Sequence, residues 1–238
     1  MSPNTPADQR DHCEVSELTG LREMKKQRTR DALIRAAHEL FVSQGYDATT
    51  VDQIAAAVQV SQRTFFRYFS NKEEVALAPQ QLMLAHFLDV FRGRPSDEAP
   101  LESLRGALDE AWADLESTIE AILPIELHMR MWELTQNTPA LLGAALLQSQ
   151  ANQDLLTEEL ARRCGLDPEG DPRPRVLVAA FVGVTDAAVR AWAHLGHESS
   201  AAARRITMSH LDQLQPALCG SWDCQDGRPE DVSTRSPC

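Results

Sequence analysis

Apolar residues recur along most of the chain at the three- and four-residue spacing of amphipathic helices. The first such stripe predicts a helix from about residue 20 to residue 44, which Gly45 ends as a C-cap. The apolar positions of this stripe are Leu33, Ile34, Ala37, Leu40 and Phe41. No stretch has the strict alternation of a β-strand, so the pattern predicts an all-α fold.

Two short helices follow this first one within a few residues. The sequence Thr50-Val51-Asp52-Gln53 fits a capping box, in which the Thr50 hydroxyl and the Gln53 amide satisfy free backbone donors at a helix start. The helix it opens is about two turns long, and Ser61 then caps a third helix that runs to Phe69. Three helices joined by such short turns must cross steeply and pack as a compact trio.

Beyond residue 72 the pattern stays helical as far as residue 218, with loops that contain Gly and Pro. About nine helices are predicted in total. The later ones are expected over 72–91, 101–122, 124–137, 139–164, 175–195 and 199–218. The polar segments 1–19 and 220–238 are expected to be a disordered arm and a disordered tail.

Charge is divided unevenly along the chain, whose net charge is -12. Residues 20–72 carry nine Lys and Arg against five acids, a local charge of +4. The remainder of the chain carries 14 Lys and Arg against 30 acids, a charge of -16. A basic module on an acidic body is expected where only one end of a protein meets phosphate.

Several classes of protein lack support in the sequence. The five cysteines are scattered, which favours free thiols, and His194 and His197 have no third ligand nearby, so no metal is expected. There is no nucleophile motif and no phosphate-cradling loop, so we expect neither an enzyme nor a cofactor. The polar start and the absence of a long apolar run predict a cytoplasmic protein.

Residues 49–72 have the layout of a helix-turn-helix, in which a supporting helix and a tight turn carry a second helix into the major groove of DNA. Arg at the leading end of that helix pairs with guanine, Gln pairs with adenine, and Thr bonds a base or contacts a thymine methyl. Thr50 and Lys72 begin the flanking helices, where an anion is favoured, so both are expected to hold phosphates. The residues at the leading end are Gln62, Arg63 and Thr64.

This region resembles the TetR family of bacterial regulators. The resemblance implies that Thr64, Phe66 and Tyr68 face DNA and that Lys72 holds a phosphate. Two positions depart from the family pattern. Gln59 stands where Gly is usual, which predicts either mild left-handed backbone strain or a slightly different turn. Phe66 stands where Tyr is frequent, and Phe cannot donate to a phosphate. The residues that carry the resemblance are Ala37, Leu40-Phe41, Gly45-Tyr46, Thr49-Thr50, Ile54-Ala55, Val60-Ser61, Thr64-Phe65-Phe66-Arg67-Tyr68-Phe69 and Asn71-Lys72-Glu73-Glu74.

Ten residues are predicted to contact DNA. Phe65 and Phe69 are instead expected in the core, because they are apolar and four residues apart. The basic run from Arg22 to Arg30 is either a solvated face or a phosphate contact, and the resemblance favours the phosphate contact. The predicted contacts are Arg30, Thr49, Thr50, Gln62, Arg63, Thr64, Phe66, Arg67, Tyr68 and Lys72.

The helical body is expected to bind a ligand and to form a dimer. The resemblance implies that the last two helices pair with those of a second subunit, and the Asn137-Thr138-Pro139 junction resembles actinobacterial members that respond to acyl-CoA or other lipidic molecules. The apolar residues between the helix expected over 72–91 and the helix expected over 175–195 either line a cavity for an apolar ligand or fill a core. The candidate ligand-binding residues are Trp112, Leu115, Ile119, Met131, Trp132, Phe181 and Thr185.

These observations predict a ligand-responsive repressor that binds a palindromic operator as a homodimer and is released by a small apolar or acyl-type effector. A small-molecule-binding or scaffold protein without specific DNA recognition is the alternative, and an activator is also compatible with the sequence. The expected domains are a helix-turn-helix domain over 20–75 and a ligand-binding and dimerisation domain over 76–219.

Overall fold

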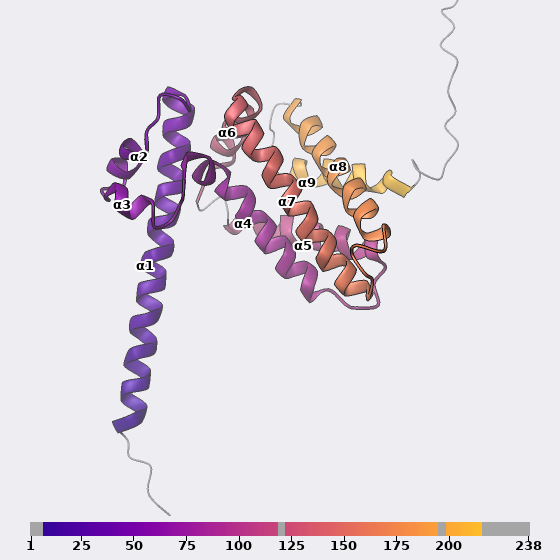
Figure 1. The fold of residues 1–238 in the computed structure, drawn as a ribbon, viewed down its shortest axis with the longest axis horizontal. Helices are drawn as coiled ribbons and strands as arrows, with labels where there is room; N and C mark the ends of the chain where they lie inside the picture. Colours follow the sequence, from indigo (N-terminus) through magenta and orange to yellow (C-terminus); the bar gives the residue numbers. More distant parts are fainter. Residues whose placement is uncertain (1–6, 119–121, 195–198, 216–238) are drawn as a thin grey trace, which may run out of the picture.

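In a computed structural model of the chain, the structure describes residues 7–118, 122–194 and 199–215, and its side chains over 22–114, 122–194 and 199–215. Within these ranges the regular elements are all helices, as predicted (Figure 1). Their bounds are α1 (Ala7–Gln44), α2 (Val51–Ala57), α3 (Gln62–Phe65), α4 (Lys72–Gly93), α5 (Pro100–Thr118), α6 (Ile125–Asn137), α7 (Pro139–Cys164), α8 (Arg173–His194) and α9 (Ser200–Asp212).

The caps that the sequence predicts form at the starts of the short N-terminal helices. The Thr50 hydroxyl accepts from the backbone N–H of Gln53, and the Gln53 side chain accepts from the backbone N–H of Thr50. Ser61 caps α3 and Asn71 caps α4 in the same manner. Gly45 adopts a φ of 91°, a conformation that a side chain would strain, and it ends α1 as expected.

The core of the N-terminal helices continues into the body. Phe41, Phe65 and Phe69 are buried in one cluster that also contains Met131 of α6 and Leu141 of α7. The expected domain boundary at residue 75 therefore lies inside α4 and marks no break in the packing. A change in α6 or α7 can reach α1 through direct side-chain contact.

The rest of the body packs around two further clusters. One joins α4, α5, α7 and α8 and contains the stacked rings of Phe87, Phe91 and Phe181. The other is smaller and places Trp192 against α9, with Trp112 and Trp132 packed beside it. In Figure 1, α4 runs from the N-terminal helices into this bundle, so it connects the two parts of the molecule.

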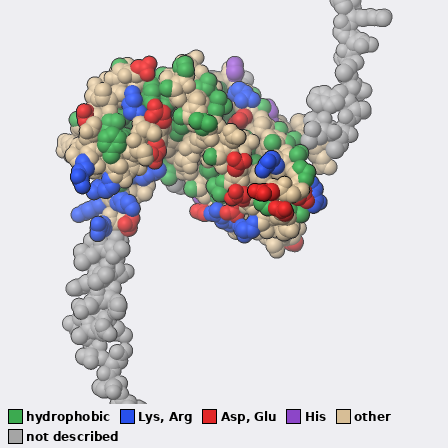
Figure 2. Space-filling view, in the orientation of Figure 1, with side chains coloured by type: hydrophobic (Ala, Val, Ile, Leu, Met, Phe, Trp, Pro, Cys, Tyr) green, Lys and Arg blue, Asp and Glu red, His purple; other side chains and the backbone are tan. Residues whose placement is uncertain are grey.

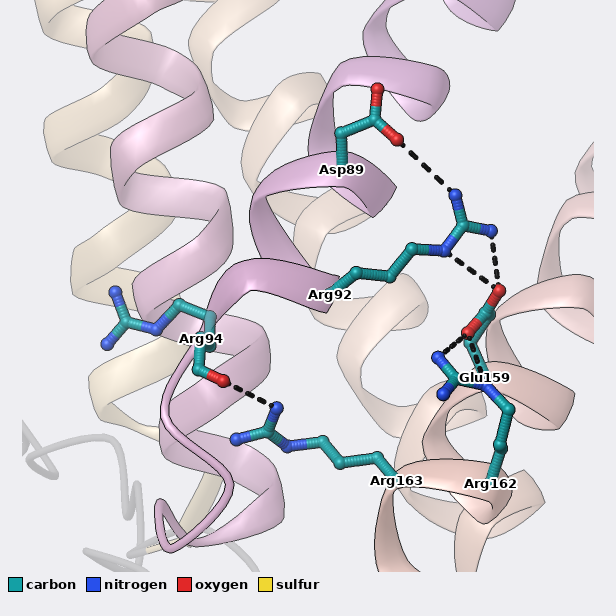
Figure 3. A network of polar contacts seen from close by, with 6 residues as sticks. All are labelled: Asp89, Arg92, Arg94, Glu159, Arg162 and Arg163. Atoms are coloured by element: carbon teal, nitrogen blue, oxygen red, sulfur yellow. Dashed lines mark hydrogen bonds and ion pairs between the residues drawn. The ribbon is translucent and has the colours of Figure 1, made fainter. Parts of the chain in front are cut away.

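A network of ion pairs fixes the far end of α4 to the end of α7 (Figure 3). Arg92 donates from Nε to Glu159 at 3.0 Å, and Arg162 donates from Nε to the other oxygen of the same carboxylate at 3.0 Å. Arg163 of α7 donates to the backbone carbonyls of Arg94 and Pro95 just beyond α4. These contacts lower the pKa of Glu159 and raise that of Arg92, chiefly through the hydrogen bond between them.

Some boundaries differ from those predicted. α1 begins at Ala7 rather than near residue 20, so most of the segment expected to be a disordered arm belongs to the helix. α3 ends at Phe65, and residues 66–68 continue as a turn, so this helix is shorter than expected. The predicted tail 220–238 lies outside the described residues. The predicted bounds of α7 agree with the structure.

By length and composition, α8 is the one helix in the described ranges that is apolar enough to cross a membrane. Its 18-residue window has a mean hydropathy of 1.6, and 22% of that window is buried. Pro174, Val178, Phe181, Ala188 and Trp192 are buried, and the other residues of α8 are half-buried or exposed. The exposed positions include Val176, Ala179 and Gly183, which share one face of the helix.

Candidate nucleic-acid interface

The leading edge of α3 is open to solvent. Gln62 and Arg63 are exposed, and Thr64 is half-buried with its hydroxyl 2.9 Å from the Ser61 hydroxyl. Ser61 also accepts from the backbone N–H of Thr64, which fixes the first turn of the helix. The three residues predicted to read bases therefore lie together on a rigid, accessible edge.

The turn before α3 has a left-handed backbone, one of the two alternatives that the sequence leaves open. Gln59 has a φ of 57° and is the one non-glycine residue in the described ranges with a positive φ. The backbone N–H of Gln59 donates to Ala56 and that of Val60 to Ala55, each at 3.0 Å. These two bonds hold the turn and compensate the strain, which amounts to about 1–2 kcal/mol for a residue with a side chain.

The residues after α3 divide between surface and core. Phe65 and Phe69 are 0% and 2% exposed, which confirms their predicted place in the core, whereas Phe66 is 50% exposed. The Arg67 guanidinium lies 5.1 Å above the Tyr68 ring centre and donates to the Tyr68 hydroxyl. Phe66, Arg67 and Tyr68 thus adjoin the exposed edge of α3, and their contacts with DNA stay predictions.

The two threonines before α2 have different surroundings. Thr49 is buried, and its hydroxyl donates to the Gly45 carbonyl and accepts from Gln44. The structure therefore argues against the predicted contact of the Thr49 side chain with DNA, because that hydroxyl is enclosed and already bonded. Thr50 is exposed, but its hydroxyl belongs to the capping box, so its observed role is to stabilise the start of α2.

Lys72 is half-buried and forms hydrogen bonds within the protein. Its Nζ donates to the backbone carbonyls of Tyr46 and Thr49 at 3.0 and 2.9 Å and lies 4.2 Å from the Tyr46 ring centre. The Tyr46 hydroxyl in turn donates to Glu73. Two of the three Lys72 donors thus join α4 to the loop between α1 and α2, which leaves one for a phosphate. Sequence reasoning missed this role, because its acceptors lie more than twenty residues away.

Basic residues of α1 lie next to this surface. Arg22, Lys25, Lys26 and Arg28 are exposed, and the Arg30 guanidinium lies 5.4 Å above the Phe69 ring centre. Figure 2 shows Lys and Arg side chains gathered where α1 meets its grey N-terminal part. The Arg30–Phe69 contact places the end of this basic part of α1 beside the segment that joins α3 to α4.

The structure separates the residues predicted to bind a ligand. Met131 belongs to the core beside α1, Phe181 to the cluster around α4, and Trp132 to the cluster beside α9. The Thr185 hydroxyl donates to the Val182 carbonyl within α8. The side chains of Leu115 and Ile119 lie outside the described residues. The predicted set therefore does not line one cavity.

Two cavities lined by described residues border Trp112. One of about 370 Å³ lies between α5 and α9, and the other, of about 170 Å³, lies between α4 and α5. Periodicity identified the helices around them as amphipathic, but it cannot show where the packing leaves space.

An exposed polar edge on a capped helix, supported by α2 and joined to it by a tight left-handed turn, defines a helix-turn-helix DNA-binding protein. The tetR family of bacterial regulatory proteins matches residues 33–78, and the MftR C-terminal domain family matches residues 98–218. The chain is similar to the transcriptional regulator TcmR of Streptomyces glaucescens, with 41% identity over 204 residues, 85% of this chain and 90% of TcmR. The chain belongs to the TetR family of transcriptional regulators.

Solved structures show the same fold. NalD, the secondary repressor of a multidrug efflux pump in Pseudomonas aeruginosa, is 19% identical with a TM-score of 0.53, over 81% of this chain and 96% of NalD. Thermus thermophilus FadR in complex with lauroyl-CoA is 24% identical with a TM-score of 0.50, over 84% of this chain and all of FadR. These comparisons confirm the predicted class of DNA-binding regulator, a family of non-enzymatic proteins.

Proposed function

We propose that this regulator is a ligand-responsive repressor that binds a palindromic operator as a homodimer. The observation that carries the proposal is the exposed leading edge of α3, where the side chains of Gln62 and Arg63 form no hydrogen bond or ion pair with the described residues. Arg63 would pair with guanine and Gln62 with adenine in the major groove. Tyr68 and Arg67 would extend the contact toward the backbone of the duplex.

The basic segment of α1 supports the phosphate part of this interface. Four of its side chains are exposed, and Arg30, which follows them along α1, contacts Phe69 in the segment after α3. Phosphate contacts fix orientation without reading sequence, and they make binding sensitive to salt. The third N–H of Lys72 would add one such contact at the start of α4.

A homodimer through α8 and α9 would cover the apolar surface of α8. Val176 is 65% exposed, and the same face carries Ala179 and Gly183, small residues that permit another helix to approach closely. A Cβ atom added at Gly183 would meet nothing within 4 Å, so this face is open in the single chain. Two-fold pairing would place two copies of α3 about 34 Å apart on DNA.

Release by an effector would follow from the connection between the body and the N-terminal helices. α4 reaches both parts, and Met131 and Leu141 extend the core of the N-terminal helices into α6 and α7. An effector that prefers one arrangement of these helices weakens DNA binding by the difference in its affinity for the two arrangements. A small apolar or acyl-type molecule is the proposed effector, and the cytoplasm is the proposed compartment.

The proposal is tested by selecting bound fragments from random DNA with the purified protein and footprinting the selected site. We expect a symmetric footprint, a protein dimer on each site, and an affinity that falls steeply as salt rises. An asymmetric footprint by a monomer would overturn the homodimer. Binding without any salt dependence or sequence preference would favour the scaffold alternative, and activation of a reporter by the bound protein would replace repression.

A further inference from the structure

The two cavities beside Trp112 have complementary chemistry. The smaller one is apolar and lies between α4 and α5, and it is lined by Met83, Leu84, Phe87, Leu108, Ala111 and Trp112. The larger one opens between α5 and α9 and brings Asp109, Arg204, Arg205 and Met208 to the other side of the same indole. Trp112 is thus a shared wall between an apolar compartment and a polar chamber.

The polar chamber carries one positive charge that nothing in it neutralises. Arg204 makes a paired contact with Asp109, with distances of 2.7 and 2.8 Å, and this contact lowers the pKa of Asp109, so both groups stay charged and cancel. Arg205 lies one residue further along α9, is exposed, and pairs with no carboxylate among the described residues. The described lining of the chamber, with Arg204 and Arg205 against Asp109, therefore has a net charge of +1 on a body with a large acidic excess.

The apolar compartment connects this chamber to the DNA-binding end of the molecule. Met83, Leu84 and Phe87 belong to α4, which begins at Lys72 in contact with the loop before α2. The far end of α4 is fixed to α7 by the Glu159 network (Figure 3). A molecule inserted between α4 and α5 would therefore act on the middle of a helix that is held at both ends.

We propose that the two cavities form one effector site for an amphipathic organic anion. Its apolar body would lie between α4 and α5 against Trp112, and its carboxylate or sulfonate would face Arg205 between α5 and α9. The volumes of about 370 and 170 Å³ together suit a small-molecule ligand. This inference rests on the proposed function as a ligand-responsive repressor and adds the location of the site and the charge of the ligand.

A pair of fluorescent probes tests the proposal directly. The first, 8-anilinonaphthalene-1-sulfonate, is an amphipathic anion, and the second, N-phenyl-1-naphthylamine, has the same rings without the sulfonate. Both are titrated into the full-length protein and into three variants: Arg205→Gln, Met83→Trp to fill the apolar compartment, and Arg130→Gln as a control at an exposed arginine of α6. Far-UV circular dichroism and thermal melting check that each variant is folded.

We expect Arg205→Gln to weaken binding of the sulfonate about threefold to fivefold, the range for a solvent-exposed ion pair, and to leave the uncharged probe unchanged. Met83→Trp should weaken both probes, and Arg130→Gln neither. If Met83→Trp does not fold, Ala111→Leu fills the same compartment. Equal binding of the sulfonate by the wild type and Arg205→Gln would overturn the proposal, as would full binding of both probes by a folded variant with a filled compartment.

Operator binding is measured separately on the same proteins. Saturating sulfonate should weaken operator binding by the wild type, and Arg205→Gln should require a proportionally higher probe concentration. Probe binding without any effect on DNA would overturn the role as effector site while leaving the DNA-binding function intact. Failure to select an operator at all would count against the proposed function and not against the probe results.

Discussion

Replacing Lys72 by Met tests whether this residue holds the fold together. Its ammonium group donates to two backbone carbonyls, at 3.0 and 2.9 Å, and lies over the Tyr46 ring. A hydrogen bond from a charged group contributes about 1.5–3 kcal/mol, and a cation–π contact at a partly exposed site about 0.5–1 kcal/mol. Because Lys72 is half-buried and partly screened, we expect the variant to lower the free energy of unfolding by about 2–4 kcal/mol.

The assay is urea denaturation followed by circular dichroism, at one protein concentration because a dimer links stability to concentration. Lys26→Met is the matched control: its ammonium is exposed and lies 3.6 Å from Glu23, a surface pair whose loss costs at most about 1 kcal/mol. The salt dependence of operator binding is measured on Lys72→Met and on the wild type, because Lys26 belongs to the basic segment that is itself proposed to contact phosphate.

A Lys72→Met protein that is as stable as the control would refute the structural role. If the slope of log affinity against log salt then also fell by about one, Lys72 would be a phosphate contact alone. Loss of stability together with a reduced slope would show that the residue serves the fold and the DNA.

Three further variants test other parts of the structure. Gln59→Gly removes left-handed strain of about 1–2 kcal/mol, but the greater entropy of the unfolded chain costs about 0.4–1 kcal/mol. The free energy of unfolding in the same urea assay should therefore rise by up to about 1.6 kcal/mol, and a fall would show that Gln59 is not strained. Gly183→Glu places a charge on the open face of α8, where it would be buried in the proposed dimer, so sedimentation should show a folded monomer. A persistent dimer would exclude this face as the dimer interface. Burial lowers the pKa of His38 from 6.5 to about 4, so the unfolded chain takes up the proton first and stability should fall as pH drops from about 6.5 to about 4. His38→Gln should make stability less dependent on pH in this range. An equally steep fall in that variant would assign the pH dependence to other groups. One of these is His128, whose pKa is also lowered by burial, to about 4.

The local features of the fold could be predicted because their causes are local. The capping box at Thr50, the Ser61 cap and the Gly45 terminus depend on residues within a few positions of one another, and all three form. The left-handed backbone at Gln59 was one of two alternatives that followed from the family resemblance, in which Gly is usual at this position, and it is the one that the structure shows. The periodic stripe of α1 likewise identified its buried face.

Features that depend on distant residues could not be predicted in this way. The carbonyl acceptors of Lys72 and the enclosure of Thr49 arise only when α4 packs against the loop after α1. The start of α1 was misplaced, because its polar first part has no apolar stripe to mark it. The described members of the predicted ligand set lie in three separate clusters, because amphipathic spacing identifies a buried face but not the gaps in its packing. Arg205, which the proposed effector site uses, belongs to a helix expected only to form the dimer.

The central claim is that the leading edge of α3 reads bases, and the most direct test is the specificity of the Arg63→Ala variant. Its affinities for the selected operator and for a scrambled duplex are measured at one salt concentration beside those of the wild type. We expect the ratio of the two affinities to fall by the equivalent of about 1–3 kcal/mol, with the affinity for scrambled DNA nearly unchanged. An unaltered ratio would show that Arg63 does not read the operator and that the edge of α3 has another role.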